Sequence, residues 1–536
     1  MQSPAVAYFC MEYGLHEDLP IYAGGLGILA GDYMKSCGDL KLPVTGIGLY
    51  WGQGYTQQKI GADGAPYDEF PVTQTDKVFD TGKRVSVPVQ GLCVTAKILE
   101  VRGYGTAPLY LLEPEAPEFK WMTERLYGGT SVNRVAQEIL LGIGGVRALR
   151  ALGIAVERYH FNEGHAVFAG VELIRERMLG GSSFEQAWRE VREQIVFTTH
   201  TPVEAGNEVH GHDLLQQMNA YGALTSAQMR ALGGEPFNMT VAGLRLASRA
   251  NAVAQLHGET ARAMWKGVEH ASPITAVTNG VHAPTWQDGR IRAAAKQGDL
   301  WAAHQACKGE LLAEIEQRTG QKLRPDVLTI GFARRAAPYK RSDLIFRKAE
   351  RIAAHLGQGR VQLIFSGKAH PQDELGKRIV ANLVKMSREF PGSVVFMQNY
   401  EMHIGRLLTR GCDVWLNNPR RPLEASGTSG MKAAMNGVLN LSVLDGWWPE
   451  GCEHGVNGWK IGDGYEGADA DERDLESLYA VLENEVMPTY AQSEKWVSMM
   501  RASIEMSHWR FSSDRMVKDY FDQLYAPGGS AHRAAS

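Results

Sequence analysis

The chain has 536 residues, more than one hydrophobic core usually supports, so at least two domains are expected. Its 44% hydrophobic and 22% charged residues are those of an ordinary globular protein, and the net charge of −4 provides neither a basic surface for nucleic acid nor a polybasic membrane signal. No run of about 18 apolar residues occurs, so a membrane-spanning helix is not expected.

The N-terminus reads as the start of a folded domain. Residues 1–15 have no basic region ahead of an apolar core, so no signal peptide is expected, and residues 5–10 predict a buried first strand. The six cysteines are scattered and form no CxxC motif. This argues against a disulfide framework or a structural zinc site and suits the reducing cytoplasm.

Short apolar runs alternate with helical patterns along most of the chain. The stretch 135–152 repeats Val135, Ile139, Ile143 and Val146 at helical spacing, and 340–356 has a similar pattern. This alternation predicts α/β domains of the doubly wound kind, with ligands at the carboxyl ends of strands. The predicted strands are 5–9, 195–198, 275–278, 327–332, 361–366, 394–397, 414–416 and 438–443.

A stretch rich in Pro, His and Gly at 281–289 interrupts this pattern and predicts a domain boundary. We expect an N-terminal domain at 1–284 and a C-terminal domain at 285–525. The last part of the second domain, from 471, is expected to be helical and to close that domain, with a return to the first domain as an alternative. The Gly/Ala/Ser-rich tail 526–536 is expected to be disordered.

Three motifs in the first half contain candidate binding residues. The Gly-rich turn 22–27 precedes a helical run and could bind a phosphate or sugar, although it lacks the full dinucleotide spacing. The string 160–165, His-Phe-Asn-Glu-Gly-His, does not have helical zinc-ligand spacing. His200 follows a strand and could equally be a packed loop residue, whereas His210 and His212 are expected to be exposed.

Two further motifs also follow predicted strands. Asn279 begins an Asn-Gly pair that marks a turn but could present its amide to a sugar hydroxyl. Arg334, Arg335, Lys340 and Arg341 follow the strand that ends at 332. Four cations at a strand's carboxyl end favour an anion site over the alternative of a solvated basic turn.

The segment 424–437, Glu-Ala-Ser-Gly-Thr-Ser-Gly-Met-Lys-Ala-Ala-Met-Asn-Gly, carries the most chemical information. Its small residues allow backbone N–H groups to surround a phosphate or a sugar hydroxyl. Lys432 could then hold a phosphate or form a Schiff base with an aldehyde cofactor such as pyridoxal 5'-phosphate (PLP). The alternative is a loop capping a helix that starts near Met431, with Lys432 in solvent.

Together these strings resemble the α-glucan phosphorylase family of glycogen, starch and maltodextrin phosphorylases. From Gly24 to Gly437 the chain contains, in order, Gly-Gly-Leu-Gly, Asn-Glu-Gly-His, Thr-His-Thr-Pro, Thr-Asn-Gly-Val-His, Arg-x4-Lys, Ser-Gly-Lys and Glu-Ala-Ser-Gly-Thr-x-x-Met-Lys. Each string alone is weak, but all of them in this order are highly specific. Asn417-Asn-Pro-Arg-Arg-Pro and Ser429-Gly-Met-Lys are most similar to the compact bacterial and archaeal branch.

The resemblance implies two Rossmann-like domains with the active site in a central cleft, the GT-B glycosyltransferase architecture. It also implies PLP bound to Lys432 as an internal Schiff base. In this family the cofactor's phosphate exchanges a proton with inorganic phosphate, which protonates the glycosidic oxygen and attacks the sugar from the same face. The products are a shortened α-1,4-glucan and α-glucose 1-phosphate with retained configuration.

The resemblance also assigns roles to matched residues. Arg335 and Lys340 would hold the substrate phosphate, because a dianion beside the cofactor's phosphate must be offset by fixed cations. The expected catalytic set is Lys432, Arg335, Lys340, His200 and Glu424. The expected cofactor contacts are Lys432, Thr428, Arg334, Trp286 and Tyr400. The expected substrate contacts, besides His200 and Glu424, are Gly25, Leu26, Gly27, Glu163, His165, Asn279, Tyr339, Ser426 and Gly427.

The chain departs from the family's larger members in several places. Ser429-Gly430 stands where they usually have Gly-Asn, and Glu401 stands where they usually have Arg after the tyrosine matched by Tyr400. An acid near the cofactor's phosphate is unfavourable unless it is paired or turned away. The N-terminal section that carries phosphorylation and nucleotide control in the animal enzymes has no counterpart, so such control is not expected. The resemblance suggests a homodimer, although the usual dimer contacts lie partly in that section.

Two other functions compete with a phosphorylase. A nucleotide-sugar glucosyltransferase of the same fold, such as a glycogen synthase, also has a Gly-Gly-Leu loop but lacks a PLP lysine, so Lys432 distinguishes the two. A carbohydrate-binding protein that has lost catalysis has no need for a phosphate clamp, so Arg335, Lys340 and Glu424 argue against it.

Overall fold

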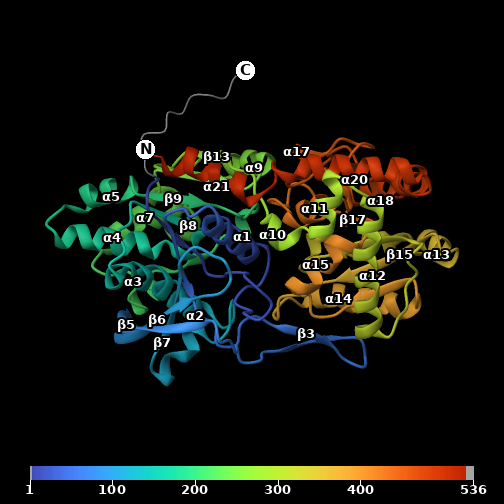
Figure 1. Cartoon of the computed structure of the whole chain (residues 1–536). Coiled ribbons are helices and arrows are strands. Elements are labelled where there is room, and N and C mark those ends of the chain that lie inside the picture. Colours follow the sequence, from blue (N-terminus) through green and yellow to red (C-terminus); the bar gives the residue numbers. More distant parts are fainter. Residues whose placement is uncertain (1–2, 527–536) are drawn as a thin grey trace, which may run out of the picture. The chain divides into compact units, whose positions relative to one another are not determined.

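The computed structural model describes residues 3–526, and the chain divides into two compact units. Unit 1 contains the residues up to Tyr55, then Phe70–Thr278, and the segment that begins at Ser513. Unit 2 contains Thr56–Glu69 and Asn279–Ser512. Figure 1 shows the chain coloured along its sequence, with most of unit 1 in blue and green and most of unit 2 in yellow and orange.

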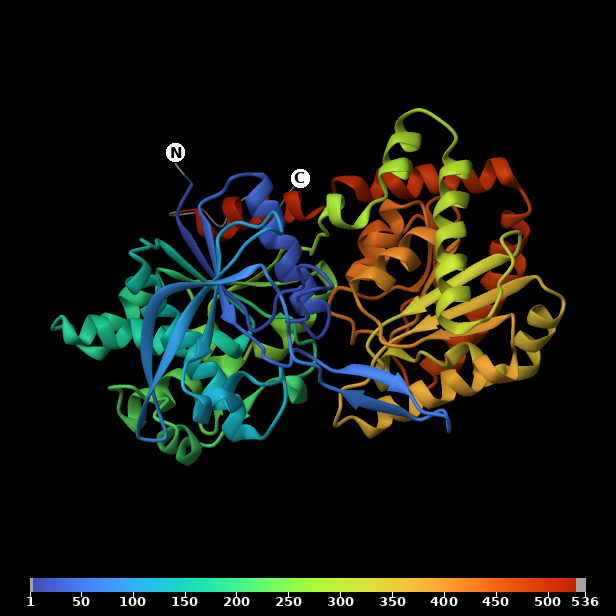
Figure 2. The same ribbon diagram turned by 60° about the horizontal axis from the view of Figure 1, so that its bottom comes forward.

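These units differ in detail from the domain scheme expected from the sequence. The main division falls after Thr278 rather than after 284, and the segment from Ser513 belongs to unit 1. The hairpin of β3 (Gln57–Ile60) and β4 (Pro66–Glu69) belongs to unit 2, where Figure 2 shows it in blue beside α14 (Glu374–Glu389). Apart from Ala526, the expected disordered tail lies outside the described residues.

Unit 1 is built on a nine-stranded sheet in the order β13-β12-β9-β8-β1-β2-β7-β6-β5. Its strands are parallel except that β6 runs antiparallel to both β5 and β7. All residues of β1 are buried, as expected for a strand covered on both faces. The strands are β1 Val6–Phe9, β2 Val44–Leu49, β5 Val78–Val89, β6 Leu92–Val101, β7 Leu109–Pro114, β8 Arg158–Asn162, β9 Ile195–Thr198, β12 Arg249–Ala252 and β13 Ile274–Ala276.

Helices and short turns complete unit 1. Its α-helices are α1 Gly25–Asp39, α2 Ser131–Ile139, α3 Gly145–Leu152, α4 Phe168–Leu179, α5 Phe184–Arg192, α6 His212–Gln217, α7 Ser226–Gly233, α8 Met239–Leu246, α9 Gln255–Trp265 and α21 Ser513–Asp519. Its other elements are η1 Pro117–Thr123, η2 Leu140–Gly144, η3 Gly164–Ala166, η4 Glu204–Gly206, η8 Tyr520–Tyr525, and the two-stranded pair β10 Val209–His210 and β11 Phe237–Asn238.

Unit 2 is built on a six-stranded parallel sheet in the order β16-β15-β14-β17-β18-β19. The order runs outward in both directions from β14 and β17, so the sheet reverses between these two strands. In doubly wound sheets, ligands bind beyond the carboxyl ends of the strands at such a point. The strands are β14 Leu328–Ala333, β15 Val361–Ser366, β16 Val394–Met397, β17 Val414–Asn417, β18 Leu439–Val443 and β19 Gly458–Ile461.

Side chains of this sheet alternate between two cores. Phe332 and Phe365 lie in one apolar cluster, while their chain neighbours Ala333 and Ile364 lie in another. Because successive side chains of a strand point to opposite faces, helices cover both faces of the sheet, as Figure 2 shows. The helices are α10 Ala283–Trp286, α11 Gly289–Lys296, α12 Leu300–Thr319, α13 Ala349–Gly357, α14, α15 Met402–Gly411, α16 Thr428–Met435, α17 Trp448–Gly451, α18 Ala470–Val481, α19 Met487–Tyr490 and α20 Ser493–His508; the shorter turns are η5 Pro338–Lys340, η6 Leu344–Lys348 and η7 Leu482–Val486.

The structure confirms the α/β class with two main sheets, but differs from the sequence in local detail. The predicted helix 340–356 begins only at Ala349, because Lys340 ends the short turn η5 and a second short turn, η6, comes before the helix. The antiparallel strands β5 and β6 were not predicted at all. Within residues 3–526, no helix is both long and apolar enough to cross a membrane.

Candidate active site

Two loops of unit 2 leave the sheet at the point where its strand order reverses. The loop after β14 carries Arg334 and Lys340, and the loop after β17 carries Glu424. Because β14 and β17 are adjacent and parallel, both loops start from the same edge of the sheet. The fold therefore brings together charged residues that are far apart in the sequence.

The carboxylate of Glu424 joins the two cations. Its Oε2 lies 2.5 Å from Arg334 Nη2 and also accepts a hydrogen bond from Lys340 Nζ. All three side chains are buried. Burial would raise the pKa of Glu424, but the charges of Arg334 and Lys340 outweigh it and lower this pKa to about 2. Glu424 is therefore ionised, and the cluster keeps a net positive charge.

Asp445 holds the backbone of the Glu424 loop, a role that the sequence did not reveal. Its Oδ2 accepts a hydrogen bond from Glu424 N at 2.9 Å, and its Oδ1 accepts one from Gly446 N at 2.8 Å. Burial and the charge of Glu424 raise the pKa of Asp445 to about 7. On the same loop, Ser426 Oγ is buried with no hydrogen-bond partner among the described residues. A buried hydroxyl in this state is suited to a polar ligand.

Lys432 lies on α16 and is only 6% exposed, so the alternative of a solvated lysine is wrong. Its Nζ lies 3.6 Å from the centroid of the Trp286 ring. Asn436 links the two residues, since its amide donates to Lys432 O at 2.8 Å and to Trp286 O at 3.1 Å. Tyr400 is a neighbour of Trp286, because a Cβ added to Gly405 would lie 3.3 Å from Tyr400 Oη and 3.7 Å from the Trp286 ring.

The N-terminus of α16 has the features of a phosphate site. Gly427 precedes the helix with a φ of 82°, which favours glycine, and the first helical residue is Thr428. A Cβ added to Gly427 would lie 3.6 Å from Arg334 Nη2, so this guanidinium is close to the helix start. Backbone N–H groups of a first helical turn and a fixed cation together suit an anion. The residues around Lys432 thus fit a cofactor that has both an aldehyde and a phosphate.

Glu401 is paired within the protein. Its carboxylate accepts hydrogen bonds from His403 N at 2.6 Å and Ile404 N at 3.1 Å, so Glu401 caps the N-terminus of α15. This interaction offsets its negative charge through the helix dipole. The neighbouring Tyr400 is half-buried, and the desolvation of its hydroxyl raises its pKa to about 12, so this hydroxyl stays protonated at neutral pH.

In unit 1, the Gly-rich loop is held by a glutamate that the sequence analysis missed. Glu12 Oε2 accepts hydrogen bonds from Ala23 N at 2.6 Å and Gly24 N at 3.2 Å, and its Oε1 accepts one from Tyr127 Oη at 2.7 Å. A Cβ added to Gly27 would lie 2.6 Å from Glu12 Oε2, whereas one added to Gly25 would meet nothing within 4 Å. The loop is therefore fixed on one side and open at Gly25.

Glu163 and His200 form a second site in unit 1, at the carboxyl ends of β8 and β9. Glu163 Oε2 accepts a hydrogen bond from His200 N at 2.8 Å, and His200 Nε2 is 2.7 Å from Asn162 Oδ1. Because the amide nitrogen of Asn162 donates to Cys10, its oxygen is the acceptor, and His200 Nε2 carries the proton. Burial lowers the pKa of His200 to about 3, so the ring is neutral and its Nδ1 is an acceptor.

The expectation that His210 and His212 are exposed is wrong, because both are buried. His210 Nε2 lies 3.0 Å from Glu138 Oε2, and the ligand atoms of Glu138, Glu208 and His210 lie within metal-binding distance of one another. Arg134 already offers a positive charge there, with Nε 2.8 Å from Glu208 Oε1. His212 bonds to Tyr221 and Gly234. Chain position alone gave no sign of these partners.

The predicted site residues thus divide between the two units. In unit 2, Arg335 is exposed on the β14 loop, and Asn279 is buried at the first position of the unit. The burial of His165 lowers its pKa to about 4, and its ring lies 5.8 Å from that of Tyr127. The group in unit 2 is Trp286, Arg334, Tyr339, Lys340, Tyr400, Glu424, Ser426, Gly427, Thr428 and Lys432; the group in unit 1 is Gly25, Leu26, Gly27, Glu163, His165 and His200.

Known proteins resemble this chain over almost its whole length. The carbohydrate phosphorylase family model matches residues 291–450. The chain is 39% identical to a maltodextrin phosphorylase of Thermococcus litoralis, over 97% of this chain and 70% of that protein. It is 37% identical to a glycogen phosphorylase of Aquifex aeolicus, over 97% and 86%, respectively. It is also 35% identical to an uncharacterised protein of Methanocaldococcus jannaschii, over 97% and 99%.

Proposed function

The chain belongs to the carbohydrate phosphorylase family, and from this premise we propose that it phosphorolyses an α-1,4-glucan with PLP bound at Lys432. The family assignment makes it a glycosyltransferase that acts on a glycogen- or maltodextrin-type glucan, and disfavours the nucleotide-sugar transferase alternative. The observation that supports the cofactor is the buried contact between Lys432 Nζ and the Trp286 ring. Lys432 lies on α16, and the N-terminus of this helix is close to the guanidinium of Arg334.

We assign the cofactor to this part of unit 2. Lys432 would hold it covalently through the ε-amine, Trp286 and Tyr400 would pack near it, and Thr428 and Arg334 would bind its phosphate. When bound, PLP supplies a phosphate group that can exchange a proton with the substrate phosphate. Arg334 would keep that group anionic, because a guanidinium stabilises phosphate through charge-assisted hydrogen bonds.

The substrate phosphate is assigned to Lys340 and Arg335. Lys340 is buried beside Glu424, so its charge acts in a medium with little screening by solvent. Arg335 is exposed on the same loop and would complete the clamp on the outer side. These cations would hold phosphate against the glycosidic oxygen and stabilise the negative charge that develops there.

The contacts to the glucosyl hydroxyls are proposed residue by residue. Glu424 is an ionised acceptor, Ser426 has a buried hydroxyl, and neutral His200 has a free acceptor at Nδ1. A sugar ring needs such donors and acceptors, because each buried hydroxyl left unpaired costs about 1–3 kcal/mol. Asn279, Tyr339, Gly427, Glu163, His165 and the backbone of Gly25, Leu26 and Gly27 complete the proposed set.

The proposed cellular location is the cytoplasm, because all six cysteines are free thiols, as is usual in a reducing compartment. The assembly state stays a prediction from the family resemblance, with a homodimer as the expected form.

An absorption spectrum before and after borohydride reduction, followed by peptide mapping, tests the cofactor assignment. A reduced adduct on Lys432, with release of glucose 1-phosphate from maltodextrin and phosphate, is the expected result. A protein that phosphorolyses maltodextrin without bound PLP, or whose adduct maps to another lysine, would contradict the proposal.

A further inference from the structure

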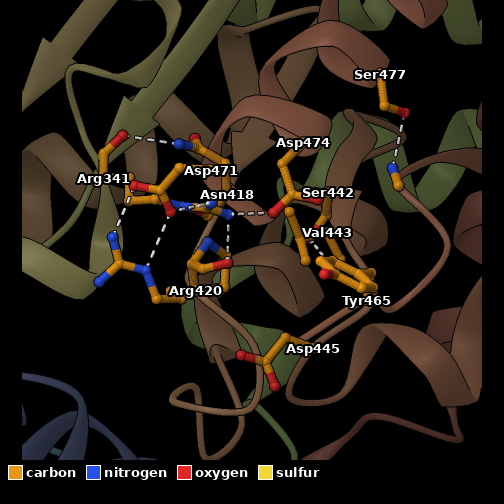
Figure 3. A network of polar contacts seen from close by, with 12 residues as sticks. Arg341, Asn418, Arg420, Ser442, Val443, Asp445, Tyr465, Asp471, Asp474 and Ser477 are labelled. Atoms are coloured by element: carbon orange, nitrogen blue, oxygen red, sulfur yellow. Dashed lines mark hydrogen bonds and ion pairs between the residues drawn. The ribbon is translucent and has the colours of Figure 1, made fainter. Parts of the chain in front are cut away.

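Arg341 follows Lys340 directly and is almost completely buried, with 1% of its surface exposed. Its Nε donates to Asn418 O at 2.8 Å, and its Nη2 donates to Pro419 O at 2.8 Å. The same guanidinium bonds to Asp474 Oδ2 at 2.6 Å and to Asp471 Oδ1 at 2.9 Å. Figure 3 shows this network. All three nitrogens of Arg341 are therefore engaged by the protein and do not face a substrate.

These bonds join the two loops that form the proposed phosphate site. Asn418 returns a hydrogen bond from its amide nitrogen to Arg341 O at 2.7 Å. Arg420 N donates to Tyr339 O at 2.7 Å. The residues on both sides of Lys340 are thus bonded to the start of the loop that carries Glu424, and Lys340 and Glu424 contact each other.

The two aspartates fix the guanidinium from the other side. Asp474 and Asp471 lie in the first turns of α18, and Asp471 also pairs with Arg420 at 2.7 Å and with Arg347 at 2.9 Å. Arg341 has a φ of 50°, which is uncommon for a residue with a side chain, so its conformation depends on these contacts. A lysine could carry the charge there but could not reproduce a planar fork with several fixed donors.

We propose that Arg341 is a positioning residue that fixes Lys340 relative to Glu424 and thereby sets the affinity for the substrate phosphate. This inference rests on the proposed function of the site. It predicts that loosening the guanidinium fork weakens phosphate binding even when the protein remains folded and holds its cofactor. A residue that only stabilised the fold would change the melting temperature or the active fraction, but not the KM for phosphate.

The test compares Arg341→Lys with Arg347→Met in the PLP-loaded enzyme. Arg347 shares Asp471 but forms no hydrogen bond to residues 418–424 in the described structure, so it is the matched control. We expect Arg341→Lys to raise the phosphate KM at saturating maltodextrin by about tenfold or more, since a tenfold loss is a modest change in binding. Arg347→Met should leave that KM within about twofold of the parent value.

PLP content and melting temperature are measured in parallel for each variant. A phosphate KM for Arg341→Lys that equals that of Arg347→Met would overturn the proposal, whatever happens to the melting temperature. If Arg341→Lys does not fold, Asp474→Asn replaces it, because it keeps the side-chain size and removes the charge of one carboxylate that holds the guanidinium. A raised phosphate KM supports the proposal, and an unchanged one overturns it. A parent enzyme that releases no glucose 1-phosphate would instead contradict the proposed function.

Discussion

Arg334 and Glu424 form a buried ion pair in which Nη2 lies 2.5 Å from Oε2, although the two residues come from loops after different strands. The same oxygen accepts a hydrogen bond from Lys340. Removing one member of a buried ion pair leaves a charge without compensation, which is more costly than losing a surface pair. Glu424 therefore offsets two cations while no phosphate is bound, in addition to its proposed contact with the sugar.

Glu424→Gln should nearly abolish phosphorolysis and lower the free energy of unfolding by about 3 kcal/mol, because Arg334 and Lys340 lose their shared carboxylate. Added phosphate should then raise the melting temperature of this variant more than that of the parent, since the two cations gain an anion. Glu466→Gln is the control, because Glu466 pairs with Arg421 at a partly exposed position. Equal stabilisation of Glu424→Gln and the parent by phosphate would contradict the assignment of these cations.

Lys432→Ala should abolish both cofactor retention and activity, because the ε-amine is the proposed attachment point and alanine has no amine to form the Schiff base. The PLP content of the purified protein and its phosphorolysis rate measure this effect. Lys460→Ala, at an exposed position on β19, serves as the control and should keep both. Full activity of Lys432→Ala without PLP would refute the cofactor site.

Much of unit 2 could be predicted because its strands are short, apolar and bounded by turn residues. The predicted ranges 361–366 and 394–397 match β15 and β16, and the prediction 195–198 matches β9 of unit 1 in the same way. Strand β5 was missed because most of its first half is exposed or half-buried, so it lacks a continuous apolar run. The predicted helix from 340 was wrong because apolar spacing does not reveal a loop fixed by the contacts of Arg341.

The motif residues of the site could be found from the sequence, but their supporting residues could not. Glu12 and Asp445 are single acids whose roles depend on backbone N–H groups brought near them by the fold. No local spacing distinguishes such an acid from an ordinary surface residue. Glu401 shows the same limit, since only the structure reveals that its carboxylate caps α15.

Arg335→Ala should mainly weaken the use of phosphate, raising the transition-state free energy by about 3 kcal/mol if the arginine closes on the phosphate in a water-excluded site. The measurement is kcat/KM for phosphate at saturating maltodextrin. Arg324→Ala removes an exposed arginine that pairs with Asp326 and provides the matched control. An unchanged phosphate dependence in Arg335→Ala would remove this residue from the site.

Glu138→Gln should gain stability over the parent protein as the pH rises. Burial raises the pKa of Glu138 to about 8 and that of the neighbouring Glu208 to about 7. His210 lies beside Glu138, and Arg134 pairs with Glu208. Because the folded-state pKa lies above the ordinary value of 4.5, the stability that protonated Glu138 contributes is complete below about pH 4.5 and is lost as pH rises toward 8.

Glutamine has no carboxyl group to ionise. The melting temperature of Glu138→Gln minus that of the parent should therefore increase between about pH 5 and pH 9, a range that covers most of the change in the pKa of Glu138 from 4.5 to about 8. Glu172→Gln is the opposite control, because Arg175 and Arg147 lower the pKa of this buried carboxyl despite its desolvation. The ionised Glu172 contributes stability above its ordinary pKa, so its loss should be at least as costly at pH 9 as at pH 5. A melting-temperature difference for Glu138→Gln that stays constant or falls with pH would contradict the raised pKa of Glu138 in the folded protein.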